Sequence, residues 1–133
     1  MITRSVTVAK IRREYWQQIA DGRKRFELRD EEVEYDSNAF VFVDAVTGEH
    51  LGNARILRHT AFGGYENSNW DWNLLAKLVE VPVAELKQLF PVAVELGNKA
   101  YFEYDMHVYE IEPISDDEIL HTLLANLPKN RLN

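Results

Sequence analysis

Two strand-like segments, separated by a short turn that contains glycine, restrict the architectures open to this chain. Segments 38–45 (NAFVFVDA) and 51–60 (LGNARILRHT) are rich in the β-branched and aromatic residues typical of strands. Between them, Thr47-Gly48-Glu49 supplies the glycine that a tight hairpin connection requires. We therefore expect an antiparallel hairpin at this point of the sequence.

Three other segments also have strand patterns. Residues 4–8 alternate and are β-branched, which predicts a first strand. Residues 100–112 are aromatic and β-branched with alternating acids, which predicts a long strand, interrupted near Asp105, that closes the sheet. Phe26 and Leu28 alternate with charged residues, which is typical of a half-buried strand with one charged face. The charged residues are Arg25, Glu27 and Arg29.

Helical patterns lie between and after these strands. Apolar residues recur at three-to-four spacing within 11–21, and Gly22 supplies a left-handed stop. Ser68 and Asp71 are spaced like a capping pair before a second helix over 69–79. Pro82 and Pro91 frame a short third helix, and the capping box Ser115–Glu118 begins a helix over 115–127. The mixture predicts an α+β fold.

Composition favours one domain in a reducing compartment. The chain has 133 residues, of which 46% are hydrophobic, and this is enough to bury a continuous core. No cysteine is present, which excludes a disulfide, a thiolate metal site and a cysteine nucleophile. No segment approaches the roughly 20 apolar residues that span a bilayer, so we expect a cytoplasmic protein without a membrane partner.

Charge is distributed unevenly along the chain. Residues 1–29 hold eight basic and three acidic groups, a net charge of +5, so the remainder carries −12 of the total of −7. Such asymmetry suggests a basic patch suited to phosphate, if the fold gathers these cations on one side. The alternative is that the cations pair with acids elsewhere on the surface.

The segment 19–29 combines a helix end, a glycine and a charged strand in quick succession. Gly22, Lys24, Glu27 and Arg29 form the pattern Gly-x-Lys-x-x-Glu-x-Arg. In this pattern the chain resembles the ASCH domain family, whose members carry that signature after their first helix. The resemblance covers most of residues 4–114 and implies a PUA-like mixed β-barrel in a single domain. The domain would also contain a helical insertion over 66–97, with its helices around 68–90, and the C-terminal helix over 115–127.

The resemblance also implies a cleft beside the motif, which recognises RNA, a nucleotide or a modified nucleoside. In this hypothesis Lys24 and Arg29 bind phosphate with Arg25 beside them, because an arginine fork matches phosphate geometry. Tyr65 and Trp70 are candidates for stacking on a base, and Asn67 for reading a base edge. Each of these roles has a structural alternative. Lys24 would be a solvated surface lysine, Glu27 and Arg29 would belong to a structural ladder of ion pairs, and Trp70 would pack in the core.

Two other functions stay open. One enzymatic branch of the family looks like an amidohydrolase of acetylated cytidine, with the motif lysine as base and a threonine as nucleophile. Lys24 matches the base and Glu80 lies near the expected third residue, but Glu27 stands where the threonine would be. A hydrolase of a modified nucleoside or of RNA would therefore use Lys24 or Glu27 as general base. The other function is a protein-interaction domain, in which the acidic remainder and the 66–96 insertion bind a partner.

The sequence predicts neither a metal nor a cofactor. The histidines, His50, His59, His107 and His121, lack the spacing of paired metal ligands. No glycine-rich phosphate loop and no Gly-x-Ser-x-Gly elbow is present, which excludes the commonest nucleotide-hydrolase and serine-hydrolase sites.

Overall fold

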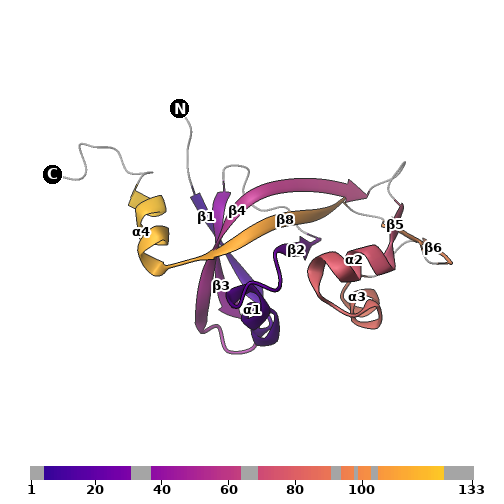
Figure 1. Cartoon of the computed structure of the whole chain (residues 1–133), viewed down its shortest axis with the longest axis horizontal. Helices are drawn as coiled ribbons and strands as arrows, with labels where there is room; N and C mark the ends of the chain where they lie inside the picture. The colour runs from indigo at the N-terminus through magenta and orange to yellow at the C-terminus, as the bar shows by residue number, and fades with distance from the viewer. Residues whose placement is uncertain are drawn as a thin grey trace. The chain divides into compact units, whose positions relative to one another are not determined.

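The computed structural model describes residues 5–30, 37–63, 69–90, 94–97, 99–102 and 105–124 (Figure 1). Five strands form a mixed sheet in the order β1-β3-β4-β8-β2, and three short strands form a second sheet in the order β5-β7-β6. The strands are β1 (Ser5–Ile11), β2 (Phe26–Arg29), β3 (Ser37–Asp44), β4 (His50–Gly63), β5 (Asn69–Asp71), β6 (Val94–Leu96), β7 (Lys99–Tyr101) and β8 (Asp105–Ile114). The helices are α1 (Arg13–Ala20), α2 (Trp72–Val79), α3 (Val83–Leu89) and α4 (Asp116–Leu124). The predicted α+β class is confirmed.

The contacts within the chain define two compact units. The first comprises residues 1–23, 33–57 and 111–133, and the second comprises 24–32 and 58–110. Strands β4 and β8 contribute residues to both units. The prediction that the whole chain is one domain stays a prediction.

In the first unit, β1 pairs in parallel with β3, and β3 pairs in antiparallel with β4. The predicted hairpin is confirmed, and Gly48 in its turn has a φ of 76°, which is in the left-handed region that favours glycine. Helix α1 ends before Gly22, which has a φ of 84°, also as predicted. Ile11 lies in β1 instead of in the helix, because its carbonyl accepts a hydrogen bond from Ala45 at 2.9 Å.

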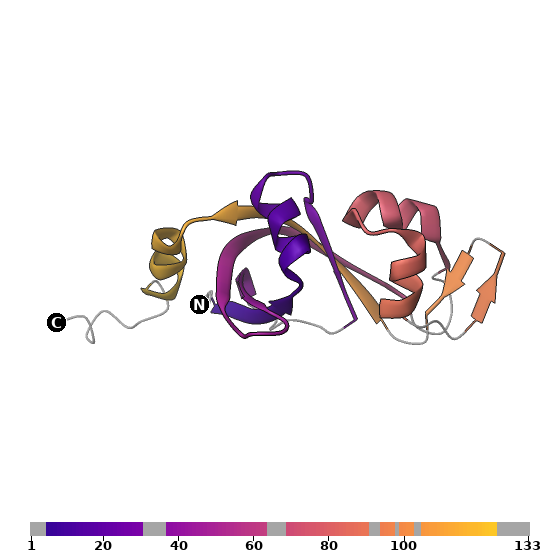
Figure 2. The same ribbon diagram turned by 90° about the horizontal axis from the view of Figure 1, so that it is seen from below.

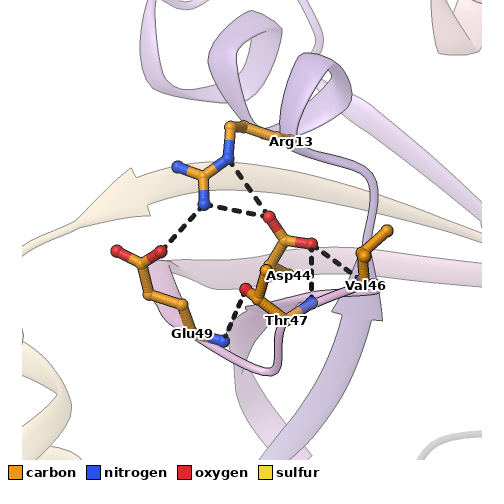
Figure 3. Close-up of polar contacts among 5 residues, drawn as sticks. All are labelled: Arg13, Asp44, Val46, Thr47 and Glu49. Atoms are coloured by element: carbon orange, nitrogen blue, oxygen red, sulfur yellow. Dashed lines mark hydrogen bonds and ion pairs between the residues drawn. The ribbon is translucent and has the colours of Figure 1, made fainter.

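The hairpin turn is tied to α1 through a carboxylate (Figure 3). The Asp44 carboxylate accepts the backbone N–H of Val46 at 2.8 Å and the guanidinium Nε of Arg13 at 3.1 Å. Arg13 also donates to Glu49 at 2.9 Å. The backbone N–H groups of Val46 and Thr47, together with Arg13, hold the pKa of Asp44 below its ordinary value of 3.8. Arg13, one of the cations of the basic N-terminal segment, is therefore paired with two acids, Asp44 and Glu49.

Helix α4 is joined to β4 through polar contacts within the same unit. Glu118 donates its backbone N–H to Ser115 Oγ at 3.3 Å, as the predicted capping box requires. Buried Asn53 donates to Asp116 at 2.6 Å, and Arg55 forms ion pairs with Glu112 and Glu118. Residues 125–127 of the predicted helix lie outside the described residues.

The second unit holds β2, α2, α3 and the small sheet. Helix α2 packs against α3, and the two lie side by side in both views (Figures 1 and 2). Residues 69–71 form β5 instead of the predicted first turn of a helix, because they pair with β7. The cap of α2 is Asp71, whose carboxylate accepts the backbone N–H of Leu74 at 3.0 Å. Pro82 precedes α3 directly, as predicted, and Pro91 lies outside the described residues.

Each unit buries its own apolar residues. Phe40 and Phe42 stack with centroids 5.1 Å apart in the first unit, and both are fully buried, as is Ile19 of α1. In the second unit Trp72 is fully buried and meets Phe102 edge to face at 5.8 Å. Within the described ranges, every helix is too short or too polar to cross a membrane.

Candidate functional site

Two residues of the sequence motif, Glu27 and Arg29, lie on β2, which is an edge strand of the five-stranded sheet. Strand β2 pairs in antiparallel with β8, so that Glu27 lies opposite Tyr109 and Arg29 opposite His107. Directly opposite residues of an antiparallel pair share one face of the sheet. These four side chains therefore form one polar face of the second unit, which we call the β2–β8 face.

Lys24, which precedes β2, is buried and holds the end of α2. Only 2% of this residue is exposed, and its Nζ donates a hydrogen bond to the Val79 carbonyl. The next residue, Glu80, has a φ of 57°, a left-handed conformation that ends the helix where glycine is the usual residue. The ammonium group thus satisfies one of the carbonyls that a helix end leaves without an internal partner.

Burial holds the pKa of Lys24 below its ordinary value of 10.5. The negative charges of Glu27, Glu80 and Glu85 oppose that shift. Lys24 is therefore a buried amine surrounded by carboxylates, and the basic residues that precede and follow it are not the cause of its lowered pKa.

Glu27 lies between two cations and is 6% exposed. One carboxylate oxygen is 3.9 Å from Lys24 Nζ, and the other is 3.7 Å from the Arg29 guanidinium. The Arg29 side chain is 15% exposed, so this guanidinium lies where the ladder of charges approaches the surface. The sequence-based alternative of an ion-pair ladder is thus present in the structure.

A histidine pair lies next to this ladder and was not predicted as a site. The Nε2 atom of His59 is 2.9 Å from Nδ1 of His107. The His59 ring also stacks on Tyr109 with centroids 4.4 Å apart and 7° between the planes. His107 and Tyr109 alternate along β8, a signal that they share a face, but only the register of β4 brings His59 to them.

The other predicted site residues are not all brought together. Arg25 is exposed, and its guanidinium lies 5.7 Å from the Phe26 ring centroid. Phe26 lies opposite Glu110 on β8, so Arg25 accompanies that pair instead of Glu27 and Arg29. Trp70 is half-buried in β5. Tyr65 and Asn67 lie outside the described residues, and their predicted roles stay predictions.

A shallow hollow of about 710 Å³ lies at the end of α2 within the second unit. Its lining residues are Asn73, Ala76, Lys77, Glu80, Val81 and Pro82. Lys24, Glu27 and Arg29 do not line this hollow, so the predicted cleft beside the motif stays a prediction. Among the residues that the structure describes, no group of three or more His, Asp or Glu is placed to hold a metal ion.

Solved structures with the same fold include an ASCH protein. The ASCH structure from Zymomonas mobilis matches with a TM-score of 0.54 and 14% identity, over 92% of this chain and 81% of that chain. A mutant form of the same protein matches with 0.54 and 15%, over 96% and 85%. The hypothetical protein PH0355 matches with 0.53 and 15%, over 83% of this chain and 100% of that chain. No family model and no curated protein sequence matches the chain.

The chain thus has an α+β fold of the PUA-like class. Within that class its structural neighbours are ASCH domain proteins, which confirms the predicted fold.

Proposed function

We propose that this chain is a member of the ASCH family that binds RNA or a nucleotide-like ligand on the β2–β8 face. Its fold and the pattern Gly22, Lys24, Glu27 and Arg29 support the family membership. The ligand class follows from the chemistry of that face, which combines a guanidinium, a carboxylate and imidazole and phenol rings.

The concentration of buried polar groups on one strand pair carries this proposal. Burying a charged or polar side chain is costly, so such groups cluster where a function or a structural need keeps them. Among the described residues, the buried polar or charged side chains are Lys24, Glu27, Asp44, Asn53 and His107. Asp44 and Asn53 hold the turn and α4, whereas Glu27 lies on β2, His107 lies on β8, and Lys24 comes two residues before β2.

Each group on the face has a role suited to a nucleotide. The Arg29 fork donates to phosphate oxygens, and Glu27 orients that fork from 3.7 Å. The exposed His59 ring, which stacks on buried Tyr109, offers a planar platform of the kind on which bases stack. Lys24 binds the end of α2 through the Val79 carbonyl, and its predicted role as a phosphate ligand stays a prediction.

Salt dependence of RNA binding tests the proposal. We would measure fluorescence anisotropy of a short fluorescein-labelled oligouridylate at increasing salt, with Arg29→Met and the exposed control Arg12→Met. Arg29→Met should weaken binding by about tenfold and reduce the salt slope by about one, because one charge-assisted phosphate contact is lost. Arg12→Met should leave both values unchanged.

Two results would contradict the proposed function. Tight binding that does not depend on salt would contradict the proposed phosphate contact, because phosphate binding releases counterions and is therefore salt-sensitive. Equal binding by wild type and Arg29→Met would contradict the β2–β8 face as the ligand site. If neither oligouridylate nor free nucleotides and nucleosides bind, the acidic remainder of the chain and a protein partner become the better hypothesis.

The surroundings of Lys24 favour a small hydrolase as a second candidate. A general base at neutral pH needs a lowered pKa, and burial lowers the pKa of Lys24. Glu80 acts on this amine through its charge and also lines the hollow at the end of α2. With an acetylated cytidine, Lys24 would take a proton from water, and the resulting hydroxide would add to the amide carbonyl. The amide C–N bond would then break as the Lys24 ammonium returns the proton to the leaving nitrogen, which gives cytidine and acetic acid that ionises to acetate.

Product analysis tests this candidate. Wild type should release acetate from N4-acetylcytidine, and both Lys24→Met and Glu80→Gln should abolish that release. Lys10→Met, an exposed lysine of β1, is the matched control and should keep full activity. Turnover that survives in folded Lys24→Met would exclude Lys24 as the base.

A further inference from the structure

His59 is exposed, yet two buried residues of β8 fix the position of its ring. Tyr109 lies parallel beneath it, and the His107 ring is 5.1 Å away with 26° between the planes. An exposed side chain loses conformational entropy when it is held in one position. Two aromatic contacts and a hydrogen bond hold this imidazole in place at the surface of the β2–β8 face.

The contact between the two imidazoles limits their protonation. A neutral imidazole has one N–H donor and one acceptor nitrogen, whereas a protonated one has two donors. The 2.9 Å contact between His59 Nε2 and His107 Nδ1 therefore requires that one ring stays neutral. It is compatible with no extra proton or with one, and it must break when both rings are protonated. The geometry therefore allows the pair to hold one extra proton but not two.

We propose that His59 and His107 share one proton and bind a phosphate group of the ligand in that singly protonated state. This inference rests on the proposed function and deepens it, because it extends the site from β2 to β8 and β4. Arg29 lies opposite His107, so the proton adds a second positive charge next to the guanidinium. Exposed His59 donates to a phosphate oxygen, and buried His107 keeps its ring in place.

The charged groups around the pair come from the neighbouring elements. On β2, Arg29 opposes the added charge and Glu27, opposite Tyr109, favours it. The remaining groups are Lys24 beside Glu27, the mutually paired Arg58 and Glu110 at 2.8 Å, exposed Asp105 of β8, and Glu80 and Glu85, whose charges act on Lys24. A phosphate next to the pair tips this balance toward the protonated state, so binding and proton uptake are linked.

Histidine ring signals in an NMR pH titration of the ligand-free protein test the shared proton. We expect the His59 and His107 signals to move together in two steps. In His59→Gln, the His107 signal should lose its second step. Independent one-step titrations of His59 and His107 in wild type would overturn the inference whether or not a ligand binds.

The pH dependence of binding tests the phosphate contact. Oligouridylate suits this assay because uracil takes up no proton between mildly acidic and mildly alkaline pH. Wild type should bind about tenfold more tightly at the mildly acidic end, the effect of one charge-assisted hydrogen bond. His59→Gln and His107→Gln should bind with little pH dependence, and His121→Gln should behave as wild type.

The outcomes separate this inference from the proposed function. RNA binding with the same pH dependence in wild type and His59→Gln would overturn the inference and leave the proposed function in place. Absence of RNA binding in wild type at every pH would overturn both. Because His59 is exposed, His59→Gln keeps the test valid if His107→Gln fails to fold.

Discussion

Replacement of Lys24 by methionine should destabilise the protein, because this lysine connects the start of β2 to the end of α2. Methionine keeps the apolar part of the side chain, which is one atom shorter without the ammonium group, but removes the hydrogen bond to the Val79 carbonyl. A hydrogen bond from a charged donor contributes about 1.5–3 kcal/mol. Relief of the cost of burying the ammonium offsets part of this loss, so we expect a net loss of about 1–2 kcal/mol.

The assay is urea unfolding at neutral pH, followed by tryptophan fluorescence. Lys77→Met is the matched control, because Lys77 is an exposed lysine of α2 and its replacement should change stability by less than about 0.5 kcal/mol. Lys24→Ala should cost about 2 kcal/mol more than Lys24→Met, because it also leaves a void. Wild-type stability in Lys24→Met would refute the role of Lys24 in holding α2.

The same pair of proteins should differ in its pH dependence. Burial places the folded-state pKa of Lys24 below the unfolded value of 10.5. Between these two values the unfolded chain binds more protons than the folded chain, so stability rises with pH. The advantage of wild type over Lys24→Met should therefore grow as the pH approaches 10.5 from below. A constant difference would contradict the lowered pKa.

Three further predictions concern the frame of the fold. Asp44→Asn should lower the melting temperature at neutral pH, because the ionised Asp44 carboxylate stabilises the fold, as its lowered pKa indicates. The variant should also lack the part of the wild-type loss of stability below pH 3.8 that comes from protonation of Asp44. Melting temperatures of the two proteins that change in parallel with pH would contradict this prediction. Gly52→Ala should cost about 1–3 kcal/mol in urea unfolding, because its Cβ would lie 1.9 Å from the Trp16 ring, and the cost should shrink in the background of Trp16→Ala. Asp71→Ala should cost about 1 kcal/mol through loss of the α2 cap, and unchanged stability in the same assay would mean that another group caps the helix.

Local sequence signals predicted the elements whose geometry is set locally. The hairpin and the end of α1 follow from Gly48 and Gly22, both of which have positive φ. The beginning of α2 did not follow, because the pairing of residues 69–71 with β7 overrides the capping pattern at Ser68. Ile11 was placed in the helix by its spacing, but pairing with β3 keeps it in β1.

The sequence predicted some residues of the candidate site but not the long-range contacts that they make. The motif correctly brought Glu27 and Arg29 onto one face, since strand alternation is a local property. The hydrogen bond of Lys24 could not be predicted in this way, because its acceptor, the Val79 carbonyl at the end of α2, lies 55 residues later in the sequence. His59 and His107 are separated by 48 residues, so only the strand register places them in contact.

An NMR titration of isotope-labelled protein with a short oligouridylate tests the central claim most directly. The account predicts that backbone signals of Phe26–Arg29 and of His107–Tyr109 shift during the titration, and that those of the Asp44 turn do not. Shifts confined to the first unit, or no shifts at all, would contradict the assignment of the β2–β8 face as the ligand site.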